Sequence, residues 1–201
     1  MTAQRRPVRR TVLAVTVAVA ALTLTACGGD DGNTKARAGS SAGSGRHNAA
    51  DVSFSQEMIQ HHRQAVQMAG LAAGHASSAQ VKSLASKIEG AQAPEIRTMS
   101  GWLTSWGEQV PQDMSGMGHD MSSSTPGMMS DADMGELEKT SGAAFDTLFL
   151  AMMVDHHKGA VAMARSEKAD GAYDPAVELA ADVITTQSAE IKQMDTMLDT
   201  N

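Results

Sequence analysis

The chain repeats itself at a constant offset of 95 residues, and the two copies align without a gap. Residues 54–103 and 149–198 are identical at fifteen of fifty positions, among them a His-His pair and one glutamate. Agreement of this density at a fixed spacing indicates an internal duplication, in which one supersecondary unit stacks on its own copy. We therefore expect one structural unit that occurs twice and whose copies pack against each other.

Apolar residues recur with a helical period in both copies. The pattern predicts four helices, over roughly 51–76, 79–106, 137–169 and 174–199. Two antiparallel hairpins of this kind form a four-helix bundle with a pseudo-two-fold axis, so we expect an all-α fold over residues 51–199. The six aromatic residues are too few for an ordinary β-sandwich or barrel. The expected organisation is repeat one at 51–106, a linker at 107–135 and repeat two at 137–199.

The composition excludes several classes of function. A formal net charge of −7 disfavours a nucleic-acid-binding protein. The single cysteine, Cys27, excludes a disulfide framework and a multi-cysteine zinc site. The sequence lacks the signatures of nucleotide-binding loops and of serine hydrolases. The unusual feature is the presence of 15 methionines beside 7 histidines.

The N-terminal segment has the pattern of an export signal. Several arginines precede an apolar run from Val12 to Leu24, which is shorter than the ~20 residues that a membrane-spanning helix needs. The segment ends in Leu-Thr-Ala-Cys27, which resembles a bacterial lipobox. We expect a lipoprotein signal peptide over residues 1–26, a lipidated Cys27 and a flexible tether over 27–50. The protein would then be exported and anchored to the outer face of the cytoplasmic membrane; an incidental Cys27 is the alternative.

Each predicted hairpin carries polar residues on its apolar face. At 100° per residue, His61 and His62 fall on the two edges of the buried arc of the first helix. Glu95 falls inside the apolar stripe of the second helix, where a carboxylate is costly unless it is paired or bound to a cation. A rise of about 1.5 Å per residue brings Glu95 close enough to the height of His62 for side chains to meet. The offset places His157 and Glu190 in the same way in the second copy.

These polar residues are candidate metal ligands near the middle of the bundle, because imidazole, carboxylate and thioether groups together can bind a transition metal. The candidates are Met58, His61, His62, Glu95 and Met99 in the first copy, and Met153, His156, His157, Glu190 and Met194 in the second. Two alternatives stay open. The histidines and glutamates can form only a buried hydrogen-bonded network that fixes the helix register. The methionines can simply fill the core.

The predicted linker carries a second kind of candidate site. Its segment Met114-Ser-Gly-Met117-Gly-His119-Asp-Met121 lies among Gly, Ser, Asp and Pro and shows no helical period. Methionines in such a segment have no core to fill, and their thioethers are soft ligands that select Cu(I). The segment resembles the copper-binding tracts of periplasmic metallochaperones. A low-complexity loop that binds no metal is the alternative.

The repeated motifs resemble those of the bacterial domain-of-unknown-function family 305. They are Met58-Ile-Gln-His-His-Arg-Gln-Ala-Val-Gln-Met-Ala69, Gln92-Ala-Pro-Glu-Ile-Arg-Thr-Met99 and their counterparts in the second copy. The resemblance covers roughly residues 51–199. It implies an exported or lipid-anchored protein with a ferritin-like bundle, in a family of which some members are associated with copper handling. The Glu-x-x-His motif of di-iron bundles does not occur here, so a di-iron oxidase lacks its ligand set.

The sequence therefore predicts a cell-envelope lipoprotein that binds copper for buffering, delivery or resistance, with zinc or no metal as alternatives. Its expected partners are a metal ion and, through the lipid, the membrane, but not nucleic acid. No catalytic nucleophile is evident, so we do not expect an enzyme. A metal-dependent redox enzyme of the bundle-core type and a structural helical module of the envelope are the competing hypotheses.

Overall fold

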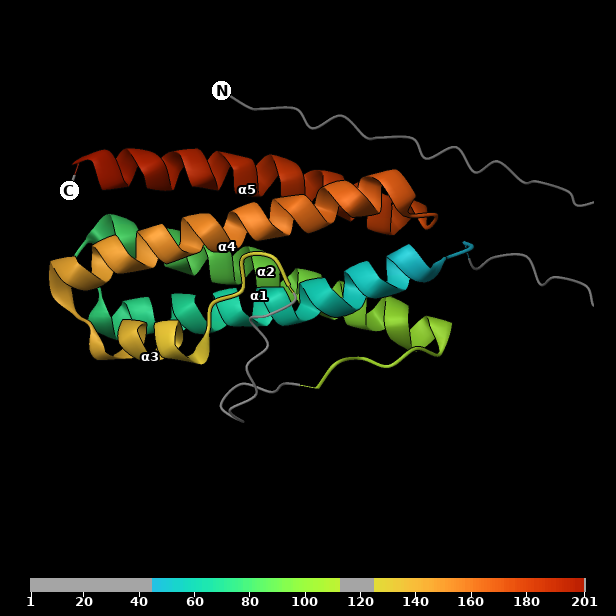
Figure 1. The fold of residues 1–201 in the computed structure, drawn as a ribbon, viewed down its shortest axis with the longest axis horizontal. Coiled ribbons are helices and arrows are strands. Elements are labelled where there is room, and N and C mark those ends of the chain that lie inside the picture. The colour runs from blue at the N-terminus through green and yellow to red at the C-terminus, as the bar shows by residue number, and fades with distance from the viewer. Residues whose placement is uncertain (1–44, 113–124, 201) are drawn as a thin grey trace, which may run out of the picture. The chain divides into compact units, whose positions relative to one another are not determined.

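The computed structural model describes residues 45–112 and 125–200. The helices in these ranges are α1 (Ala49–His75), α2 (Ala79–Trp106), α3 (Asp131–Lys139), α4 (Gly142–Asp170) and α5 (Asp174–Thr200). Helices α1 and α2 form one antiparallel hairpin, α4 and α5 form another, and the short α3 leads into α4 (Figure 1). The prediction of an all-α bundle built from two helical hairpins is confirmed. None of the helices in the described ranges is long and apolar enough to cross a membrane.

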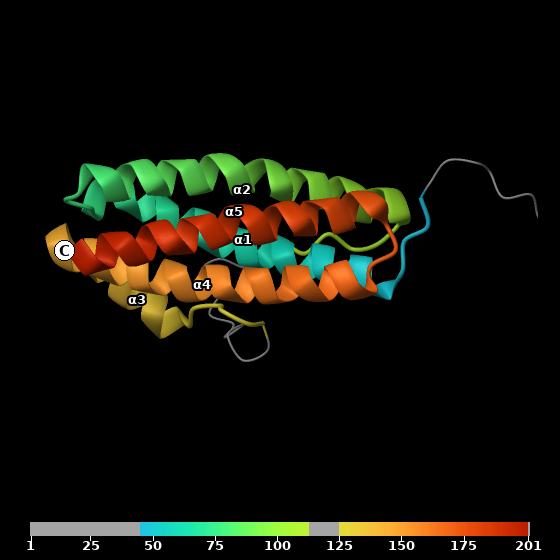
Figure 2. The same cartoon turned by 90° about the horizontal axis from the view of Figure 1, so that it is seen from above.

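The two hairpins meet along α1 and α4, which run in opposite directions (Figure 2). At one end of this contact, Asn48 before α1 donates a 2.7 Å side-chain hydrogen bond to the carbonyl of Asp170 at the end of α4. At the other end, Ala76 after α1 forms a backbone bridge with Gly142 at the start of α4. Helix α2 packs on α1 and α5 packs on α4. The arrangement brings the two His-His pairs, one on α1 and one on α4, to the same interface.

Two buried aspartates related by the 95-residue offset hold the ends of this interface. Asp51 of α1 accepts a 2.9 Å hydrogen bond from the backbone N–H of Tyr173, in the turn between α4 and α5. Asp146 of α4 accepts a 2.9 Å hydrogen bond from the backbone N–H of Ser78, in the turn between α1 and α2. Each carboxylate also accepts from the preceding N–H of the same turn. Each hairpin therefore fixes the turn of the other through charge-assisted hydrogen bonds.

The second hairpin begins differently from the prediction. The single helix expected over 137–169 is two helices, because the two residues before Gly142 are extended. Helix α3 starts at a capping box, in which the hydroxyl of Ser130 accepts from the N–H of Asp133 and the Asp133 carboxylate accepts from the N–H of Ser130. Gly142 adopts a φ of 68°, which a residue without Cβ does at little cost, and thereby opens α4 in a new direction.

A layer of polar side chains divides the core of the bundle into two halves. The polar layer consists of His61, His62, Gln92, Glu95, His156, His157, Gln187 and Glu190. The first half-core lies on the side of Ala49 and includes Phe54, Met58, Met99, Leu103 and Met163. The second half-core lies on the other side and includes Met68, Leu84, Phe149, Met153 and Met194, together with Met134 and Leu137 of α3. The offset of 95 exchanges the two halves, so the polar layer lies on the pseudo-two-fold axis.

Candidate metal centre

Four imidazoles occupy the middle of the polar layer and none of them has any exposed surface. His61 and His62 come from α1, and His156 and His157 come from α4. The rings of His61 and His156 face each other across the interface between the hairpins, with centroids 3.7 Å apart. His62 and His157 point instead into their own hairpins. The two rings of each pair point in different directions because consecutive helical residues diverge by 100°. One ring therefore faces the other hairpin, and the other ring faces the second helix of its own hairpin.

The outer histidines are each held by a glutamate of the same hairpin. Nε2 of His62 lies 2.6 Å from a carboxylate oxygen of Glu95, and Nε2 of His157 lies 2.7 Å from that of Glu190. Both glutamate side chains are 23% exposed, so the carboxylates reach the edge of the bundle rather than its interior. Since a carboxylate accepts, Nε2–H donates, and Nδ1 of each ring is left as the atom with a free lone pair.

The inner histidines have still fewer partners. His61 donates its Nε2–H to the carbonyl of Pro126 at 3.2 Å, and its Nδ1 has no partner. Neither nitrogen of His156 has one. Burial, followed by the neighbouring imidazole of His62, lowers the pKa of His61 from 6.5 to about 3. Burial and then the ring of His61 lower the pKa of His156 well below 6.5. Both rings are therefore neutral at pH 7, which is the protonation state that a metal ion requires.

Most of the unpartnered atoms in the layer are electron-pair donors. The unpartnered atoms are Nδ1 of all four histidines, Nε2 of His156, and the side-chain oxygens of Gln92 and Gln187. Of the two nitrogens of His156, one carries the proton and the other the lone pair. Each buried polar atom without a partner costs about 1–3 kcal/mol, so a native protein rarely keeps several of them in one place without a reason. A cation would satisfy several of these lone pairs at once. The chemistry of the layer therefore fits a bound metal ion.

The ligands are not already assembled around a point. Within residues 45–112 and 125–200, no three His, Cys, Asp or Glu side chains converge closely enough to hold a metal ion. Rotation of the imidazole side chains is needed before His61 and His156 can share a metal with a third group. The ring faces, rather than the ring nitrogens, meet in the described conformation.

The methionines predicted as ligands flank the polar layer on both sides and are fully buried. Met58 and Met99 lie in the first half-core, and Met153 and Met194 lie in the second. Each pair comes from both helices of one hairpin. Met58 and Met153 lie about one helical turn before the histidines of their own helix, and Met99 and Met194 lie about one turn after Glu95 and Glu190. Thioether groups are therefore available above and below the layer. The same side chains also fill the core, as the alternative interpretation required.

The last part of the linker, around Pro126, covers the inner histidines, which the sequence did not predict. Pro126 and Gly127 pack directly on Gly159, where a Cβ would clash with the carbonyl group of Pro126. Gln64, the residue at the same place in the first copy, holds the segment through two hydrogen bonds of 2.9 and 2.8 Å with the backbone of Met129. Gly159 provides the space that the segment needs, and Gln64 provides the hydrogen bonds that hold it. The Gln/Gly difference between the copies is the signal that was available in the sequence.

The remaining predicted sites lie outside the described residues. They are the linker residues Met114, Met117, His119 and Met121, and the lipidation site Cys27.

The fold and the polar layer together define a duplicated helical-hairpin bundle with one buried His-His pair in each copy. The chain belongs to the DUF305 family, a domain of unknown function, whose sequence profile matches residues 51–198. This confirms the resemblance found in the repeated motifs. No curated protein sequence matches the chain.

Several solved structures share this fold over most of their length. A DUF305 protein from Streptomyces coelicolor, described as secreted, is 31% identical, with a TM-score of 0.67 over 75% of this chain and 92% of its own. A DUF305 fragment from Deinococcus radiodurans is 29% identical, with a TM-score of 0.68 over 77% of this chain and 98% of its own. The Cu(II)-bound form of CopM is 33% identical, with a TM-score of 0.65 over 75% of this chain and 96% of its own. CopM has also been solved with Cu(I) and with Ag bound.

Proposed function

We propose that this protein binds copper in the cell envelope, and that the polar layer of the bundle is its principal site. The observation that carries the proposal is the set of four buried, closely grouped imidazoles with unpartnered lone pairs. The similarity to CopM, which has been solved with Cu(I), Cu(II) and Ag bound, supports copper rather than zinc as the metal. Imidazole suits either metal, so the choice does not rest on the histidines alone.

The residues of the layer have distinct roles in this proposal. His61 and His156 are the central ligands, because their rings meet across the interface and their lone pairs are free. His62 and His157 are oriented by Glu95 and Glu190, as carboxylates orient metal-binding histidines in many proteins. Cu(II) would take nitrogen and oxygen ligands from the layer.

Reduction of the metal would change the ligands that it prefers. Cu(I) is soft, and the four flanking methionines, Met58, Met99, Met153 and Met194, offer thioethers to it from either half-core. Burial keeps the site away from bulk water and limits the access of oxidants, which favours retention of Cu(I). The site is thereby suited to storage or transfer of the ion in both oxidation states.

The position in the envelope rests on the N-terminal sequence. The pattern of residues 1–27 predicts export and lipidation at Cys27, and a relative of the same fold from Streptomyces coelicolor is described as secreted. In this proposal the lipid anchors the bundle to the outer face of the cytoplasmic membrane, and residues 27–50 separate the two. The linker residues Met114, Met117, His119 and Met121 form a separate Cu(I) capture site.

A competition titration tests the proposal. The mature chain without its lipid, residues 28–201, is titrated with Cu(I) and Cu(II) separately against chelators of known affinity. We expect the double variant His61→Gln/His156→Gln to weaken binding by more than about 100-fold, equivalent to about 2.7 kcal/mol. Deletion of 113–124 should leave the layer's affinity unchanged and remove only the Cu(I) capture site. His75→Gln, which changes a histidine outside the layer, is the matched control.

Two results would contradict the proposal. If wild-type protein does not compete with the chelators, the histidines and glutamates form a structural network and no more. If binding is lost on deletion of 113–124 but survives the histidine substitutions, the linker is the metal site and the bundle only supports it.

A further inference from the structure

A groove of about 360 Å³ runs between α1 and α4 on the surface of the first half-core. The polar, acidic and sulfur-containing side chains in its lining are Ser53 and Glu57 of α1 and Met163, Ser166, Glu167 and Asp170 of α4. No lysine, arginine or histidine lines it. We call it the α1–α4 groove.

The groove leads toward the inner histidines. On α1, the lining residues step along one face from Ala50 to Glu57, which stands one helical turn before His61. On the antiparallel α4 they step back from Asp170 to Ala162. The groove ends at Pro126, the residue whose carbonyl oxygen accepts the hydrogen bond from Nε2 of His61. One backbone segment thus separates its inner end from the His61–His156 pair.

Glu167 is a buried acid in the wall of the groove. It is 1% exposed, and neither carboxylate oxygen accepts a hydrogen bond from an N–H or hydroxyl donor. Burial, and then the hydrogen bond with the neighbouring Asp51 carboxylate, raise its pKa to about 8, so Glu167 is protonated at pH 7. A cation that replaces this proton would be paired with both carboxylates. The wall of the groove therefore favours a positively charged ligand.

The other half of the molecule carries different side chains at the positions that correspond to this groove under the offset of 95. The positions equivalent to Ser53 and Glu57 are Leu148 and Met152. The position equivalent to Glu167 is Ala72. The apolar surface that results is covered by α3, which packs on both α1 and α4. One copy of the duplication has therefore been closed with apolar side chains, and the other is open and acidic.

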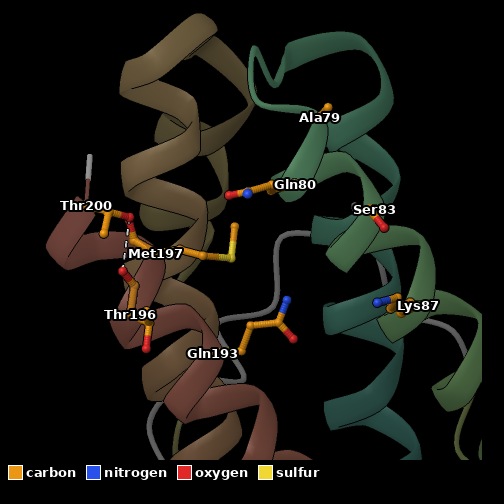
Figure 3. A pocket seen from close by; sticks show the side chains of 8 residues that line it. All are labelled: Ala79, Gln80, Ser83, Lys87, Gln193, Thr196, Met197 and Thr200. Atoms are coloured by element: carbon orange, nitrogen blue, oxygen red, sulfur yellow. Dashed lines mark hydrogen bonds between the residues drawn. The ribbon is translucent and has the colours of Figure 1, made fainter.

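Another groove in the described part of the chain has a different lining. It lies between the start of α2 and the end of α5, has a volume of about 770 Å³, and its one charged side chain is Lys87 (Figure 3). Gln80, Gln193 and Met197 project toward the open space (Figure 3). It has no carboxylate or imidazole in its lining, so it offers a metal cation no electrostatic attraction.

We propose that the α1–α4 groove is the path by which metal cations reach the buried histidines. This inference rests on the proposed copper site and adds its route of access. Glu57 and Asp170 attract the cation electrostatically, and Met163, which belongs to the first half-core, offers the first soft ligand at the inner end. Displacement of the Pro126 carbonyl from His61 then exposes the inner pair.

The test is the rate at which the mature, lipid-free chain takes up Cu(II), measured by stopped-flow absorbance of the imidazole–Cu(II) charge-transfer band. In Glu57→Gln/Asp170→Asn we expect the association rate at low salt to fall about 3- to 10-fold, while the dissociation rate stays the same. The difference should shrink as added salt screens the two charges. Glu178→Gln/Asp199→Asn removes the same charge from exposed positions of α5 and is the matched control, expected to load at nearly the wild-type rate.

A steric variant tests whether the metal passes through the groove without changing the charges that line it. Ala162→Trp fills the groove from an exposed position of α4 and should slow loading by at least about 10-fold, whereas Ala151→Trp, exposed on α4 but outside the groove, should not. If wild type binds Cu(II) in the layer and both groove variants load at the wild-type rate, the inference is wrong and the site stands. If wild type does not bind Cu(II) in the layer, the proposed function and the route fail together.

Discussion

At the scale of the residue, the distinguishing feature is that the two inner imidazoles, those of His61 and His156, are kept neutral by burial and retain ring nitrogens without partners. The helical spacing of His61 and His62 was enough to predict that both lie on the buried face. The rise per residue also predicts that Glu95 can reach a histidine of its own hairpin, and the repeat predicts the same for Glu190, but neither decides which histidine of each pair is bonded. The contact between His61 and His156 could not be predicted, because it depends on how the two hairpins are rotated against each other.

The depressed pKa values predict that the metal-free protein is sensitive to acid. Unfolded imidazoles titrate near pH 6.5, whereas the pKa of His61 is lowered to about 3 and that of His156 is also far below 6.5. The unfolded chain therefore binds more protons below pH 6.5, and the free energy of unfolding falls as the pH falls from 6.5 toward the folded-state pKa.

The expected loss is at most about 1.4 kcal/mol per pH unit for each of the two histidines. Urea unfolding of the metal-free protein at pH 7, 6 and 5 measures it. His61→Gln/His156→Gln should flatten this dependence, and His47→Gln, outside the polar layer, should not. An equally steep fall in the double variant would show that other groups cause the acid sensitivity.

Glu167 predicts a pH dependence of the opposite sign. Its pKa is raised from 4.5 to about 8 in the folded state, so between these values the folded chain holds a proton that the unfolded chain has lost. The free energy of unfolding then falls as the pH rises from 4.5 to 8. The free energy of unfolding of Glu167→Gln, relative to that of wild type, should rise by about 2–4 kcal/mol between pH 5 and pH 8.5, since the amide has no charge to bury. The same comparison with the exposed Glu178→Gln should show no such trend.

At the scale of the element, the ends of the hairpins are fixed by side chains of the opposite hairpin. Asp51 and Asp146 are identical under the 95-residue offset, yet they lie before the segment in which the repeat is dense, so the sequence did not single them out. The division of the second hairpin into α3 and α4 was missed because the helical period runs on across the extended pair of residues before Gly142. Capping chemistry at Ser130, rather than periodicity, marks that start.

Loss of one aspartate should loosen one end of the bundle. Asp146→Ala leaves the backbone N–H groups of Ser77 and Ser78, in the turn between α1 and α2, without their acceptor. We expect the free energy of unfolding to fall by about 2–4 kcal/mol, from two or more charge-assisted bonds. The control is Asp155→Ala, which removes an exposed ion pair with Lys158 and should cost under about 1 kcal/mol. Similar losses in the two variants would mean that Asp146 does not hold the turn.

At the scale of the whole molecule, the duplication creates a polar layer that cuts one core into two. The repeat predicted the four-helix bundle and its pseudo-symmetry, because both follow from the pattern of apolar residues. The departures from symmetry could not be predicted, since they depend on which surface α3 and the Pro126 segment cover. Those departures leave the α1–α4 groove uncovered at the first half-core, whereas α3 covers the corresponding surface of the second half-core.

Binding in the layer should stabilise the fold as a whole, because the ligands come from both hairpins. Cu(II) at 100 times its dissociation constant should raise the free energy of unfolding by about 2.7 kcal/mol, measured as a shift in the thermal midpoint. His61→Gln/His156→Gln should remove the shift, whereas deletion of 113–124 should preserve it. A shift that is retained in the histidine variant would place the stabilising metal elsewhere.

The most direct test of the central claim is to locate the metal. Crystals of residues 28–201 grown with copper would be measured with X-rays on both sides of the copper absorption edge, so that anomalous difference density marks copper alone. We predict one strong peak in the polar layer, in coordination distance of the imidazoles of His61 and His156. Copper found only at the surface, with the His62–Glu95 and His157–Glu190 hydrogen bonds unchanged and no peak between the hairpins, would contradict the account.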